Sequence, residues 1–128
     1  MKKTYSAFLT AVLLFGASTA FAAGALDGKT FTGPMGPKGS ETSRGDDTVT
    51  FKRGKFNSSI CAQFGYSDGK YKTETKDGAL EFTARTKNKK GDTMDWKGTV
   101  KDGKLDATAV TTEDGATDES WFKGTLKK

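Results

Sequence analysis

The sequence predicts an all-β protein, an antiparallel up-and-down meander barrel of about eight strands. Apolar and polar residues alternate over most of the chain after residue 48, which is typical of strands that bury one face. Asp-Gly pairs recur between these stretches and favour tight hairpin turns. No segment requires a helix. The four pairs are Asp68-Gly69, Asp77-Gly78, Asp102-Gly103 and Asp114-Gly115.

The first residues have the pattern of a secretory signal peptide. Lys2 and Lys3 precede an apolar run at 7–16, and small residues then lead to Ala-x-Ala at 20–22. This apolar run is too short for a transmembrane helix. We therefore expect a signal peptide at 1–22, cleavage after Ala22 (alternatively two residues earlier), and a periplasmic or secreted product without a membrane span.

Residues 23–128 are enough for a single domain. Its first part contains both prolines of the chain, at Pro34 and Pro37, together with several glycines and few apolar residues. This composition predicts a long Gly/Pro-rich loop at 34–47. Long loops in compact domains often bind ligands or partners, although simple disorder is the alternative.

The predicted strands follow in order from Thr48. Val49 and Phe51 face one way, and Arg53-Gly54 turns the chain back towards Phe56. Further alternating stretches occupy 70–76, 80–85, 94–101, 105–109 and 122–126. The inward positions that they define are Phe51, Phe56, Tyr71, Leu80, Phe82, Trp96, Leu105 and Phe122.

One polar face per strand means that the sheet must close or fold over to bury its apolar face. Closure also removes the exposed strand edges that promote aggregation. A two-sheet β-sandwich is the alternative, but successive short turns favour a meander over Greek-key crossings.

A short internal repeat supports closure. Trp96-Lys97-Gly98-Thr99-Val100 matches Phe122-Lys123-Gly124-Thr125-Leu126, and Phe31-Thr32-Gly33 is a third aromatic-x-Gly sequence. In a strand these two residues share a face, so the glycine leaves room for a ring or a bent backbone. With the serial Asp-Gly hairpins, these motifs resemble the lipocalin-like, calycin-type small barrels of bacterial periplasmic proteins. The resemblance covers roughly residues 48–128 and implies a barrel architecture.

Catalytic and metal-binding motifs are not evident. The chain has no histidine, the commonest general base and a frequent metal ligand. We therefore expect no enzyme, no cofactor and no metal site; catalysis would need Cys61, Tyr66 or a carboxylate pair. The acidic run at 113–119 lacks EF-hand spacing, which favours a hairpin over a calcium site. The chain has a net charge of +5, with basic and acidic residues interspersed along the strands. Nucleic acid is therefore not an expected partner.

The segment 58–66 is the least regular part of the sequence. Its Cys61 is the single cysteine, so no intramolecular disulfide is possible. Apolar neighbours predict a buried thiol, and a reactive or intermolecularly paired thiol is the alternative. The segment itself either plugs one mouth of the barrel with Phe64 and Tyr66, or forms one wall of a ligand entrance facing the long loop.

Two functional hypotheses follow. The first is a non-enzymatic protein that binds a small apolar or amphipathic ligand in the barrel interior, at Tyr71, Phe82, Trp96 and Phe122. The second is a periplasmic interaction protein or inhibitor, which uses loops on a filled barrel to contact an envelope protein. An open interior favours the first hypothesis, and a filled interior favours the second.

Overall fold

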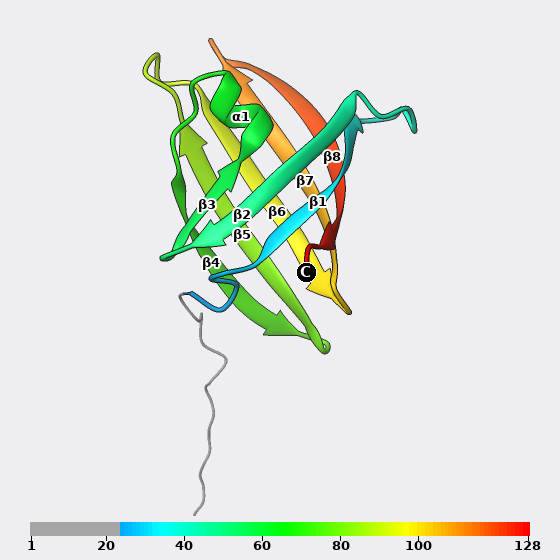
Figure 1. The fold of residues 1–128 in the computed structure, drawn as a ribbon. Coiled ribbons are helices and arrows are strands. Elements are labelled where there is room, and N and C mark those ends of the chain that lie inside the picture. The colour runs from blue at the N-terminus through cyan, green and yellow to red at the C-terminus, as the bar shows by residue number, and fades with distance from the viewer. Residues whose placement is uncertain (1–23) are drawn as a thin grey trace, which may run out of the picture.

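The computed structural model describes residues 24–128, which form a closed antiparallel barrel of eight strands in sequence order (Figure 1). The predicted signal peptide and its cleavage after Ala22 lie outside the described residues. Each strand pairs with the next, and the last pairs with the first, which confirms the up-and-down barrel. The strands are β1 (Thr30–Pro37), β2 (Gly45–Lys52), β3 (Lys55–Ser58), β4 (Gly69–Lys76), β5 (Ala79–Lys87), β6 (Thr93–Lys101), β7 (Lys104–Glu113) and β8 (Ala116–Leu126).

Four two-residue turns close the hairpins β2–β3, β4–β5, β6–β7 and β7–β8. Both residues of each turn have positive φ, as tight turns of this kind require. These turns are Arg53-Gly54, Asp77-Gly78, Asp102-Gly103 and Asp114-Gly115. Asp68-Gly69 differs from the other three Asp-Gly pairs, because Gly69 begins β4. A Cβ at Gly69 would overlap the carbonyl oxygen of Arg85.

The predicted extent of the loop, 34–47, is wrong at both ends. Strand β1 continues through Pro37 and strand β2 begins at Gly45, so only residues 38–44 connect them. Pro34 is exposed and pairs with β2, whereas the pairing of β1 with β8 skips this position. A proline fits a strand where its missing N–H is not needed by the neighbouring strand.

The connecting segment is anchored by Trp121 on the outside of β8. Its indole Nε1 donates a hydrogen bond to the Ser40 carbonyl oxygen at 2.7 Å. The indole ring lies against Gly36, where a Cβ would come within 2.7 Å of ring atom Cζ2. A tertiary contact therefore orders a segment whose composition alone predicts a loop.

A short helix, α1 (Ser59–Gln63), links β3 to β4 and lies at one end of the barrel (Figure 1). The sequence did not predict it, because five residues are too few to show helical periodicity. Ser58 is its N-cap, and the side-chain Oγ accepts a hydrogen bond from the Cys61 N–H at 3.2 Å. Within residues 24–128, no helix has the length and apolar character needed to cross a membrane.

Aromatic rings fill the half of the barrel farther from α1. Phe51 lies at the centre of this cluster, with its ring centroid 4.9 Å from that of Tyr71 and 5.2 Å from that of Phe82. Trp96 lies 4.9 Å from Phe56, centroid to centroid. Such edge and tilted contacts add to the stabilisation from burial alone.

The aromatic-x-Gly interpretation is confirmed by the packing around two glycines. At Gly98 an added Cβ would lie 2.8 Å from Cε1 of Phe82, the residue opposite on β5. At Gly124 it would lie 2.6 Å from Cζ of Phe122, two residues earlier on the same strand. Each glycine therefore leaves the space that one buried ring occupies.

Candidate functional site

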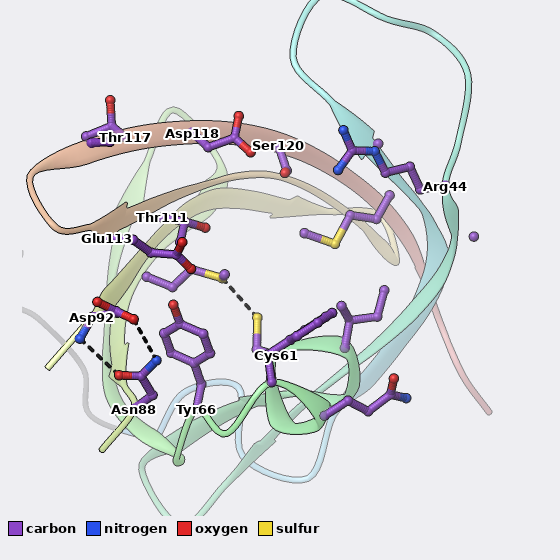
Figure 2. Close-up of a pocket in the computed structure, with 18 of the residues that line it drawn as sticks. Arg44, Cys61, Tyr66, Asn88, Asp92, Thr111, Glu113, Thr117, Asp118 and Ser120 are labelled. Atoms are coloured by element: carbon purple, nitrogen blue, oxygen red, sulfur yellow. Dashed lines mark hydrogen bonds between the residues drawn. The ribbon is translucent and has the colours of Figure 1, made fainter. Parts of the chain in front are cut away.

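A pocket of about 840 Å³ opens at the α1 end of the barrel (Figure 2). Residues from α1, from the turn between β5 and β6, and from the adjoining ends of β1, β2, β6, β7 and β8 line it. Small-molecule sites usually measure about 300–1,000 Å³. The pocket therefore has room for one small ligand, and we call it the mouth pocket.

The floor of the mouth pocket is apolar. It includes Met35 of β1 and Met94 of β6. Trp96 lies one inward position below Met94, and Phe122 is paired with Met35 across the sheet. The filled aromatic core is thus the base on which the pocket rests. Methionine side chains are flexible and polarizable, so this floor can adapt to different apolar groups.

The four residues predicted to bind ligand belong to the filled half of the barrel. Tyr71, Phe82, Trp96 and Phe122 are each at most 3% exposed, and none of them lines the mouth pocket. The open volume lies one layer nearer α1 than these residues. The alternation of the sequence predicts which side chains face inward. It does not predict how far along the barrel their rings fill the interior.

Tyr66 brings an unpaired polar group to the pocket. The residue is 6% exposed, and its Oη atom has no hydrogen-bond partner among the described residues. Figure 2 shows the phenol standing within the mouth, with its hydroxyl directed away from the backbone of its own segment. Thr86 Oγ1 and Trp96 Nε1 are the other two buried side-chain atoms without a partner among the described residues. Buried polar groups are nearly always hydrogen-bonded, so the unpartnered Tyr66 hydroxyl is an unusual feature of this pocket lining.

Asp47 holds the α1 wall of the pocket in place. Its carboxylate is fully buried and accepts hydrogen bonds from Ser58 Oγ at 2.6 Å, Ser59 Oγ at 2.9 Å and the Ile60 N–H at 3.0 Å. This role is not apparent from the sequence, because Asp47 falls at the end of the predicted loop at 34–47. Its period-two spacing from Val49 was the available signal, since an acid at an inward position needs hydrogen-bond donors.

The positions of Phe64 and Tyr66 decide whether the segment 58–66 plugs the mouth of the barrel or forms a wall of the entrance. Tyr66 is buried, whereas Phe64 is 72% exposed and does not enter the barrel. Ile60, Cys61 and Gln63 also line the pocket. The segment therefore forms one wall of the entrance, as the second interpretation predicts, and does not plug it with both rings.

Carboxylates gather on one side of the mouth. Glu113 and Asp118 come from the β7–β8 hairpin, and Asp92 comes from the turn between β5 and β6. Arg44 lies on the other side of the opening in Figure 2. Burial raises the pKa of Tyr66, and the negative charges of Glu113 and Asp92 raise this pKa further.

Cys61 is buried beneath the pocket wall, as predicted. It is 2% exposed, and its thiol donates to Met94 Sδ at 2.9 Å. Burial raises the pKa of the Cys61 thiol to about 11. The thiol is therefore neutral near pH 7 and a poor nucleophile. Within residues 24–128, no group of three or more Cys, Asp and Glu side chains is placed to hold a metal ion.

The acidic run at 113–119 forms the β7–β8 hairpin, in agreement with the hairpin prediction. Together the described residues define a small calycin-like antiparallel barrel, with a filled core and a pocket at one mouth. Comparison of the chain with protein-family models, curated proteins and solved structures found no match.

Proposed function

We propose that this protein is an exported, non-enzymatic binding protein that takes a small amphipathic ligand in the mouth pocket. The observation that carries the proposal is the combination of an open volume of about 840 Å³ with the buried, unpaired hydroxyl of Tyr66 above an apolar floor. Ligand sites characteristically pair a mostly apolar surface with a few well-placed polar groups.

Two further observations support this proposal. Barrels of eight strands either fill with side chains or hold one small ligand, and this barrel has a filled level and an open level. The resemblance to lipocalin-like periplasmic barrels and the signal-peptide pattern at 1–22 point to a binding role in the periplasm or outside the cell. Fold likeness alone does not establish function, so the pocket carries the argument.

A dye titration with a matched pair of variants tests the proposal. Nile red, a neutral apolar dye, should gain fluorescence on binding the protein. Ala116→Trp introduces a bulky ring at the pocket lining, directly after the Asp114-Gly115 turn, and should abolish most of the signal. Ala79→Trp is the control, because Ala79 directly follows the Asp77-Gly78 turn at the other end of the barrel.

Circular dichroism should show that both variants remain folded. Equal dye binding by Ala116→Trp and the parent protein would contradict the proposed site, and no binding of any apolar probe would contradict the proposed function.

The interaction-protein hypothesis is the second candidate, and one observation favours it. Phe64 is the one large apolar side chain exposed among the described residues, and it stands at the rim of the mouth. Exposed aromatic residues often anchor protein interfaces. Affinity capture from cell-envelope extract, with Phe64→Ser as the comparison, tests this candidate. A partner that is retained by the parent protein and lost with the variant would favour it.

A further inference from the structure

We propose that the mouth pocket selects ligands with a cationic head group on an apolar chain. This inference rests on the proposed function and specifies the chemical class of the ligand. The head group would lie between the carboxylates of the rim and the Tyr66 hydroxyl, and the chain would lie on the methionine floor.

The acidic residues of the β7–β8 hairpin that line the pocket occupy inward positions of their strands. Glu113 follows buried Ala109 at even spacing on β7, and Asp118 precedes buried Phe122 at even spacing on β8. Alternate residues of a strand share a face. Both residues therefore share the inward-facing side of their strands and line the exposed rim of the mouth, whereas the other charged residues of these strands belong to the outer face.

The lining of the mouth pocket contains more acidic than basic residues. Four acidic residues and two basic residues line the pocket, whereas the whole chain carries a net charge of +5. The negative charge is thus local to the mouth. Glu113 and Asp118 are exposed at the rim, so their attraction for a cation acts through solvent and is screened by salt. The lining acids are Asp46, Asp92, Glu113 and Asp118.

The basic residues of the mouth do not neutralise this charge. Lys90 has a side chain that is 80% exposed, and its Nζ lies 3.9 Å from Asp92 Oδ2. Ion pairs with such exposure contribute little. Arg44 is exposed and lies across the opening from Asp92 and Glu113.

Tyr66 contributes an unpaired acceptor close to these carboxylates. The residue lines the pocket, and its Oη atom is buried and lacks a partner among the described residues. Its lone pairs can accept a hydrogen bond from an ammonium N–H. Glu113 and Asp92 act electrostatically on this same phenol. The unpaired acceptor and the carboxylates therefore belong to the same pocket lining, an arrangement suited to an ammonium group.

Isothermal titration calorimetry with three probes of equal chain length tests the inference. Decylammonium, decyl maltoside and decanoate differ only in head group and are used below their micellar concentrations. We expect decylammonium to bind most tightly and decanoate most weakly. The preference for decylammonium should shrink as salt is added, because ions screen the rim charges.

Charge-removing variants then locate the selectivity. Glu113→Gln and Asp118→Asn should each weaken decylammonium binding by about three- to fivefold, as expected for a partly exposed charge pair, and leave decyl maltoside unchanged. Asp114→Asn is the matched control. It removes the same charge from the tip of the same hairpin, outside the pocket lining, and asparagine accepts the positive φ of this position.

The outcomes separate the inference from the proposed function. Equal affinity for all three probes, or tighter binding of decanoate, would overturn the cation preference and leave a binding protein in place. Failure of every probe to bind would overturn both. If Asp114→Asn weakened decylammonium binding as much as Glu113→Gln, the effect would be one of net charge, and the proposed site would be wrong.

Discussion

At the scale of single residues, two buried tyrosines have opposite roles. Tyr71 Oη donates to Asp27 Oδ1 at 2.7 Å and accepts from the Leu26 N–H at 3.0 Å, which ties the N-terminal turn to the barrel. Tyr66 Oη has no partner among the described residues. Both rings are buried, so burial does not distinguish a structural tyrosine from a candidate binding residue. Their hydrogen bonds do.

The paired variants Tyr71→Phe and Tyr66→Phe test this distinction. Tyr71→Phe should lower the free energy of unfolding by about 1–3 kcal/mol, because it leaves the buried Leu26 N–H without its acceptor. Tyr66→Phe should change it by no more than about 0.5 kcal/mol, since no hydrogen bond is lost. Urea denaturation measures both. Equal losses would show that the Tyr66 hydroxyl has a stabilising partner.

At the scale of elements, α1 depends on a residue outside itself. A helix of five residues is far below the length that is stable alone. The buried carboxylate of Asp47 on β2 accepts hydrogen bonds from Ser58, Ser59 and Ile60, and so attaches α1 to the sheet. One wall of the mouth pocket therefore depends on a single buried acid.

Asp47→Asn should lower the free energy of unfolding by about 2 kcal/mol or more, because an amide presents donors where the carboxylate accepts hydrogen bonds. It should also weaken Nile red binding, since the α1 wall loses its anchor. Asp46→Asn is the control for stability, because Asp46 is exposed on the same strand. Similar stability of both variants in urea denaturation would show that α1 is held by other contacts.

At the scale of the whole molecule, the barrel has a filled half and an open mouth, and it has no intramolecular disulfide because the chain has one cysteine. Stability comes from the packed rings and from other buried side chains. Two of the buried groups, the Cys61 thiol and the Tyr71 phenol, are weak acids that stay neutral in the folded protein. Burial raises the pKa of the Cys61 thiol from 9.0 to about 11. Burial, with the hydrogen bond to Asp27, raises the pKa of Tyr71 from 10.0 to about 12.

These shifts predict loss of stability in alkali. The folded state holds both protons more tightly than the unfolded state, so the stabilisation is complete below pH 9 and declines as pH rises from 9 to about 12. The melting temperature should therefore fall across this range. Cys61→Ala should remove the fall between pH 9 and 10 and leave the fall between pH 10 and about 12 that comes from Tyr71. A melting temperature that does not change with pH in this range would contradict the burial of both groups.

The fold was largely predictable because its signals are local. Asp77-Gly78, Asp102-Gly103 and Asp114-Gly115 form the turns expected of them. Gly98 and Gly124 make room for rings as the repeat indicated. The extent of the loop at 34–47 was not predictable, because the Trp121 hydrogen bond to Ser40 and the strand pairing of 34–37 and 45–47 depend on distant parts of the chain.

The sequence by itself determined the all-β class, the order of the hairpins after residue 48 and the inward face of their strands, because alternation and turn chemistry act between near neighbours. Only the tertiary structure decided where the interior is filled and where it is open. The aromatic side chains of seven strands meet in one layer, while the next layer holds Met35, Cys61, Tyr66 and Met94 around open space. That division depends on the volumes of side chains brought together by closure of the barrel, and no local pattern records it.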